Sequence, residues 1–179
     1  MDAYDRADAA RTEPLRTADE RATLVTFLDH QRATFVMKCA GLTTEQLRAR
    51  PLAPSALSLL GLARHLAEVE RGWFRNVLAD EAVPGYWKRP DGSFSEFDVE
   101  DADPEEAFAV WRGECEHARQ LVAATESLGF VGHYRGSTGA DGDDAYSLRW
   151  ILTHMIEEYA RHNGHADLLR EHLDGRTGE

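Results

Sequence analysis

The fold is decided by the stretch SLRWILTHMIEEYARHNGHADLLREHL, residues 147–173. Its apolar side chains recur at steps of four and three residues, a spacing typical of a helix that turns one face into a bundle. These residues form a single seam: Leu148, Leu152, Met155, Tyr159, His162, Ala166, Leu169 and Leu173. Ser147 is a favourable N-cap and Gly175 a favourable stop signal, so the stretch predicts one long helix whose apolar seam contains a histidine.

Three more segments carry the same helical pattern. The expected ranges are residues 17–40, about 58–78 and 103 to about 128, with a short helical turn at 43–47. The first opens with the capping-box pair Thr17 and Glu20, and the third opens at Asp103. The apolar side of the first is marked by Leu24, Leu28, Phe35 and Val36, and that of the second by Leu59, Leu62, Leu66, Val69, Trp73 and Val77. Helices of this length, about 30 Å, predict an all-α fold, a four-helix bundle.

Two long connections, residues 80–102 and 129–146, separate the predicted helices. Loops of more than about 12 residues are often functional. Each connection either folds over a site or is a plain crossover with an acidic face toward solvent. Residues 141–144 are an example of such an acidic stretch. We expect a single domain over residues 1–179, with a loosely ordered N-terminal segment at 1–16 and no strand pattern of comparable strength.

Charge and cysteine content exclude several classes of partner. The 179 residues include 20 Lys and Arg against 32 Asp and Glu, a formal net charge of −12. A chain this acidic has no basic surface for nucleic acid or for an anionic membrane. No segment approaches the roughly 18 apolar residues that a membrane span requires. Cys39 and Cys115 lie in predicted helices, so we expect buried or free thiols and a reducing cytoplasm.

Two histidines lie in positions that the helical pattern assigns to the core. His162 belongs to the seam of the last helix, and Glu158 lies one turn before it on the same edge. His65 belongs to the apolar stripe of the second helix. Two histidines and a carboxylate that face one interior predict a divalent metal site, although hydrogen-bonded core histidines are the alternative interpretation. His154, one turn before Glu158, is a competing ligand.

A dinuclear iron site is a different interpretation of the histidines. Di-iron bundles use two Glu-x-x-His motifs together with two further glutamates. Only Glu114 and His117 have that spacing here, on the third predicted helix. A single copy does not build the dinuclear site, so His117 is expected on the solvent side or between helices.

The stretch SLLGLARHLAEVERGWF, residues 58–74, and the stretch 147–173 resemble the two signature helices of the DinB-like metalloprotein superfamily. The resemblance covers about residues 18–174 and is nearest to the actinobacterial, mycothiol-linked branch. It implies that His65, Glu158 and His162 bind one divalent ion. Glu158 departs from the commoner pattern, because many members have histidine there. His165, three residues after His162, is expected beside the ligands or facing the substrate.

The resemblance also implies a function. The expected cofactor is a divalent metal ion, zinc first, with nickel, iron and manganese also compatible with two histidines and one carboxylate. The expected reaction is S-transfer from a low-molecular-weight thiol of the mycothiol or bacillithiol type to an electrophilic small molecule, with the metal activating the thiol as a thiolate. A homodimer is implied as well. The alternative is a non-catalytic metal-binding stress-response protein.

Four further residues are candidates for substrate binding. Trp73 lies two turns past His65 on the same stripe, where a plain core role is the alternative. Tyr86 and Trp87 lie in the first long connection and are candidates for a lid. Arg161 lies beside the expected ligands and suits a carboxylated substrate, with an ion pair on a solvated face as the alternative.

Overall fold

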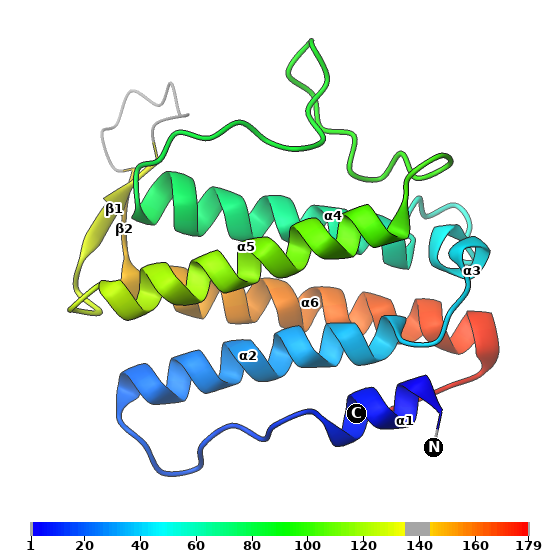
Figure 1. Ribbon diagram of the computed structural model, residues 1–179, viewed down its shortest axis with the longest axis horizontal. Coiled ribbons are helices and arrows are strands. Elements are labelled where there is room, and N and C mark those ends of the chain that lie inside the picture. The colour runs from blue at the N-terminus through cyan, green and yellow to red at the C-terminus, as the bar shows by residue number, and fades with distance from the viewer. Residues whose placement is uncertain (1, 135–143, 179) are drawn as a thin grey trace.

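The computed structural model describes residues 2–134 and 144–178, and it confirms the all-α bundle (Figure 1). The main helices are α2 (Glu20–Cys39), α4 (Leu59–Glu70), α5 (Pro104–Ala124) and α6 (Leu148–Asp174). A π-helical segment, η1 (Arg71–Leu78), continues α4 without a break. The connection from η1 to α5 runs back along the bundle, so that α4 and α5 point the same way while α2 and α6 point the other way (Figure 1).

The helix ends follow local capping chemistry. The Oγ of Ser147 accepts a hydrogen bond from the backbone N–H of Trp150 at the start of α6, and Gly175 ends that helix with a φ of 77°. Only glycine adopts this left-handed conformation without strain. Asp103 caps α5. The short helix α3 (Thr44–Arg48) begins with the predicted capping box.

Three details of the sequence prediction were wrong. The first long helix starts at Glu20 rather than Thr17, because the Asp19 carboxylate accepts a hydrogen bond from the backbone N–H of Ala22 and caps it there. The helix α5 ends at Ala124, four residues before its expected end. Val36 is 40% exposed and does not mark a core face. In the N-terminal segment, residues Ala3–Ala9 form the short helix α1.

A small antiparallel ribbon, which the sequence pattern did not indicate, joins α5 to α6. It consists of β1 (Val131–His133) and β2 (Ala145–Ser147), with Gly132 opposite Tyr146. Each strand is only three residues long, too short for a period-two pattern to be detected. Residues 135–143, which include most of the acidic stretch 141–144, lie outside the described part of the chain.

The core confirms the predicted helical faces. The side chains of Leu62 and Leu66 on α4 and of Leu152, Met155 and Tyr159 on α6 are buried. Both cysteines are buried and free. Within the described residues, no helix has the length and apolar character needed to cross a membrane.

A buried polar network takes one residue from each main helix. Glu70 of α4 is fully buried, and its two oxygens accept hydrogen bonds from Arg32 of α2 at 2.8 and 2.7 Å. The hydroxyl of Tyr159 on α6 donates to Glu70 at 2.8 Å and accepts from the indole N–H of Trp111 on α5 at 2.8 Å. Burial raises the pKa of Tyr159, which keeps the hydroxyl protonated. The network fixes the rotation of α6, and therefore of the neighbouring Glu158.

Candidate metal centre

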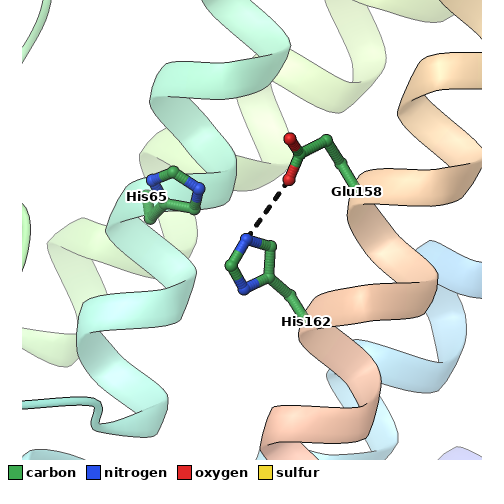
Figure 2. Close-up of side chains that lie close together, drawn as sticks. All are labelled: His65, Glu158 and His162. Carbon is green, nitrogen blue, oxygen red and sulfur yellow. Dashed lines mark ion pairs between the residues drawn. The ribbon is translucent and has the colours of Figure 1, made fainter. Parts of the chain in front are cut away.

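The structure brings His65, Glu158 and His162 together between α4 and α6. One nitrogen or carboxylate oxygen from each residue lies within 4.8 Å of the others. Figure 2 shows the Glu158 and His162 side chains pointing from α6 toward His65 on α4. Glu158 and His162 share a face because four residues make about one helical turn. The packing of α4 against α6 then supplies the third residue.

The three side chains are close but not sealed from solvent. His162 Nε2 lies 3.3 Å from Glu158 Oε2, and the two imidazole rings are 4.7 Å apart between centroids. The side chains are 25% exposed for His65, 15% for Glu158 and 11% for His162. A small molecule can therefore approach the cluster from outside the bundle.

The electrostatics of the cluster fit a cation. Burial, together with the nearby His65 and His165, lowers the pKa of His162 to about 4. Its imidazole is therefore neutral at pH 7 and has a lone pair available for coordination. Glu158 Oε2 is buried and accepts no hydrogen bond from the described residues. A buried carboxylate oxygen without a hydrogen bond is costly, and a divalent ion between it and the two imidazoles would satisfy it.

Both histidines of the cluster have a second contact. His162 Nδ1 lies 3.2 Å from Nδ1 of His165, the residue expected beside the ligands. His65 Nδ1 lies 3.4 Å from Oε1 of Glu96, in the connection between η1 and α5. Sequence reasoning missed Glu96, because a residue in an irregular loop has no periodicity that assigns it to a face.

His154, the competing ligand, lies next to the cluster. Its Nε2 is 3.7 Å from Glu158 Oε1 and its Nδ1 is 3.3 Å from Glu157 Oε2. These three residues form a second group with donor atoms within 4.8 Å of one another. Its third member, Glu157, is half exposed, so this group is more open to water than the cluster of His65, Glu158 and His162.

Two of the substrate-binding candidates border the cluster: Trp73 through His154, and Arg161 through its own contact with Glu158. The Trp73 ring lies 4.8 Å from the ring of His154, which in turn contacts Glu158. Trp73 also contacts the rings of Tyr146 on β2 and of Trp150 on α6. Arg161 is exposed, forms an ion pair with Glu157, and has its Nη1 3.8 Å from Glu158 Oε1.

Tyr86 and Trp87, the two lid candidates, lie against arginines of η1 and α4. The guanidinium of Arg71 lies 4.2 Å from the centre of the Tyr86 ring, and that of Arg64 lies 4.7 Å from the Trp87 ring. Trp87 lines a cavity of about 370 Å³ whose lining residues do not include His65, Glu158 or His162. The contacts of both rings are thus with Arg64 and Arg71, and their role as a lid stays a prediction.

The pair Glu114 and His117 does not form a metal motif. Glu114 is buried and accepts hydrogen bonds from Arg71 at 2.6 Å and Arg75 at 3.3 Å. His117 Nε2 lies 2.8 Å from a carboxylate oxygen of Glu81. Glu114 Oε1 and His117 Nε2 therefore contact side chains outside α5 and not each other.

The helical bundle and its cluster of two histidines and one glutamate define a protein of the DinB-like superfamily. A family model described as mycothiol S-transferase matches residues 23–175, and the chain belongs to this family. The match runs from α2 to the end of α6 and includes all three clustered residues. A search of curated proteins gave no match.

Proposed function

We propose that the chain is a divalent-metal-dependent mycothiol S-transferase, with His65, Glu158 and His162 as the metal ligands. The convergence of these three side chains from two helices, in a chain of this family, carries the proposal. Two imidazoles and one carboxylate suit zinc best, and they also suit nickel, iron and manganese.

When bound, a divalent ion with three protein ligands keeps a coordination position open, and a thiol that enters it loses its proton near neutral pH. The overall reaction joins the thiol sulfur to an electrophilic carbon, releasing the thiol proton and any leaving group with its bonding electrons. His165 would hold the His162 ring through the contact between their Nδ1 atoms, which leaves Nε2 of His162 facing Glu158.

The second substrate in this proposal is an electrophilic small molecule. The rings of Trp73 and its neighbour His154 form an aromatic wall beside Glu158, and Arg161 supplies a cation at the rim. Tyr86 and Trp87 would contact the outer part of a bound substrate, since arginines of η1 and α4 hold both rings. We also propose that the protein forms a homodimer and that it is located in the cytoplasm.

The test compares two histidine variants of α6. His162→Ala removes a proposed ligand, whereas His172→Ala removes an exposed histidine whose Nδ1 lies 2.8 Å from the backbone oxygen of Leu168. We expect about one equivalent of metal in the wild-type protein and in His172→Ala, measured by elemental analysis, and strong loss in His162→Ala. Consumption of mycothiol with monobromobimane as the electrophile should follow the metal content.

Two outcomes would contradict the proposal. Full metal occupancy in His162→Ala would show that the ligand assignment is wrong. Unchanged turnover after the metal has been removed by a chelator would exclude the metal-dependent mechanism. Metal binding without turnover of any thiol and electrophile pair would favour the non-catalytic alternative.

A further inference from the structure

A short part of the connection between η1 and α5 lies directly against His65. The Glu96 Oε1 atom is 3.4 Å from His65 Nδ1, and the Glu96 side chain is only 13% exposed. Its other oxygen, Oε2, is buried and has no hydrogen-bond partner among the described residues. A carboxylate withdrawn from water in this way needs a nearby positive charge or an N–H donor.

The next residue, Phe97, fixes the position of the loop on α4. Its ring stacks on the His65 ring, with centroids 5.7 Å apart and planes inclined by 28°. The ring occupies a hollow at Gly61, one turn before His65. A Cβ atom at position 61 would lie 2.6 Å from Phe97 Cδ1, closer than packed carbon atoms approach. The absence of a side chain at Gly61 therefore allows the loop to reach His65.

Two arginines, one of them buried on α4, hold the same part of the loop. Arg50 donates a hydrogen bond to the backbone oxygen of Phe97 at 2.7 Å, and Arg64 donates to the backbone oxygen of Asp98. These bonds attach the residues on the C-terminal side of Glu96 to the segment before α4 and to α4 itself. Glu96 is thus fixed against His65 by its neighbours, independently of its own contact.

We propose that Glu96 is a positioning residue for the metal centre: it accepts the Nδ1–H hydrogen bond of His65 and leaves Nε2 as the metal-binding atom. This rests on the proposed function, in which His65 is a ligand. Figure 2 shows one ring nitrogen of His65 turned toward Glu158 and His162 and the other turned away. A carboxylate on the remote nitrogen fixes the tautomer and ring orientation of a ligating histidine and increases its basicity. Glu96 also adds a negative charge near the ion, beside that of Glu158.

The first test compares three variants by metal affinity. Glu96→Ala removes the acceptor, and we expect the dissociation constant for Zn²⁺, measured by chelator competition, to rise about 10- to 100-fold. Glu96→Gln keeps an acceptor oxygen at the same place and should restore most of the affinity. Asp101→Ala is the matched control, because it removes an exposed acid of the same loop and should leave the affinity unchanged.

The second test reads the tautomer of His65 in the metal-free protein. Long-range ¹H–¹⁵N NMR at about pH 8.5, well above the ordinary imidazole pKa, distinguishes the two neutral tautomers. We expect His65 to carry its proton on Nδ1 in the wild-type protein and in Glu96→Gln. In Glu96→Ala the signal should shift toward the mixture of tautomers found for a free imidazole.

The third test uses a variant that moves the loop without changing Glu96. Gly61→Ala places a methyl group where the Phe97 ring lies, so the ring and Glu96 must shift away from His65. Alanine is the better helix former, so the helix itself is retained. We expect weaker Zn²⁺ binding and the same change of His65 tautomer as in Glu96→Ala. Gly113→Ala, at a site with open space around the added methyl group, is the control.

The outcomes separate this proposal from the proposed function. An unchanged His65 tautomer in Glu96→Ala, or wild-type affinity for Zn²⁺ in that variant, would overturn the positioning role. Failure of the wild-type protein to bind any divalent metal would overturn the proposed function and, with it, the role of Glu96 at a metal centre. In that case a wild-type Nδ1–H tautomer that is lost in Glu96→Ala would still establish the hydrogen bond itself.

Discussion

At the scale of residues, two interior glutamates have opposite environments. The oxygens of Glu70 accept hydrogen bonds from Arg32 and Tyr159, so its charge is compensated within the protein. Glu158 keeps a buried oxygen without such a partner. Its other contacts are the imidazoles of His154 and His162 and the exposed Arg161 at 3.8 Å, so its charge is less well compensated than that of Glu70 and a cation would be favourable beside it. Glu70 is a structural residue, and Glu158 is a candidate ligand.

Removing Glu70 should destabilise the bundle more than removing an exposed acid. Glu70→Ala removes the buried partner of the Arg32 guanidinium, leaving it only the partly exposed Asp29, and takes away the acceptor of Tyr159. We expect a loss of about 3–5 kcal/mol in the free energy of unfolding, measured by urea denaturation. Glu116→Ala, at a 62% exposed acid of α5, should stay within about 0.5 kcal/mol of wild type. Similar losses in both variants would show that the network contributes little.

The residues of the cluster could be predicted only where they lie on helices. Helical spacing placed Glu158 and His162 on one face, and the apolar stripe around His65 placed that residue in the interior. The structure brings the three together as this reasoning expects. Glu96 lies in an irregular loop, where the approach of one side chain to another depends on tertiary contacts such as the Phe97 ring against Gly61.

At the scale of elements, the ribbon between α5 and α6 is tightly packed against η1. Gly132 lies so close to the backbone of η1 that an added Cβ would be 2.2 Å from the carbonyl oxygen of Val77. Gly132 pairs with Tyr146, whose ring contacts Trp73 of η1. The Tyr146 ring therefore extends the aromatic wall of Trp73 and His154 next to the proposed metal centre, and the ribbon holds it there.

Substitution of Gly132 should move this wall. In Gly132→Ala the methyl group has no space against the rigid backbone of η1, so the ribbon must shift and Tyr146 with it. We expect a destabilisation of roughly 1–3 kcal/mol and a higher KM for the electrophile, with metal affinity retained. Gly129→Ala, where the added methyl group meets only ordinary contact, is the control. A wild-type KM in Gly132→Ala would separate the ribbon from substrate binding.

Capping chemistry explains which elements could be predicted. Asp103 before α5, and Ser147 and Gly175 at the two ends of α6, act locally, so the sequence identifies them directly. Asp19 replaced Thr17 as the first cap because two good N-cap residues lie within three positions, and spacing alone does not rank them. The π-helical hydrogen bonding of η1 has no sequence signature of this kind.

At the scale of the whole molecule, a bound ion would connect two helices that are far apart in sequence. His65 lies on α4, and Glu158 and His162 lie on α6, so an ion held by all three stabilises only the folded bundle. At a free metal concentration 100 times the dissociation constant, the gain is about 2.7 kcal/mol. For a chain of this size, that is a rise in Tm of roughly 5–10 °C.

This rise is measurable by differential scanning calorimetry with Zn²⁺ added to metal-free protein. The same titration on His162→Ala should give a much smaller rise, because one of the three donors is missing. A rise that is equal in both proteins would place the stabilising ion elsewhere, since the surface carries many of the 32 acidic side chains.

The burial of both cysteines has a consequence for any chemistry at this protein. Cys39 and Cys115 are free but buried, and burial raises the pKa of each thiol, that of Cys115 also through the nearby Glu70. A protonated, inaccessible thiol is a poor nucleophile. Native protein incubated with monobromobimane alone should show no added mass by intact-protein mass spectrometry, whereas urea-unfolded protein should gain two labels, one for each of its two cysteines. In the proposed function, the protein is in this way protected from its own electrophilic substrate, and its two cysteine sulfurs take no part in the reaction.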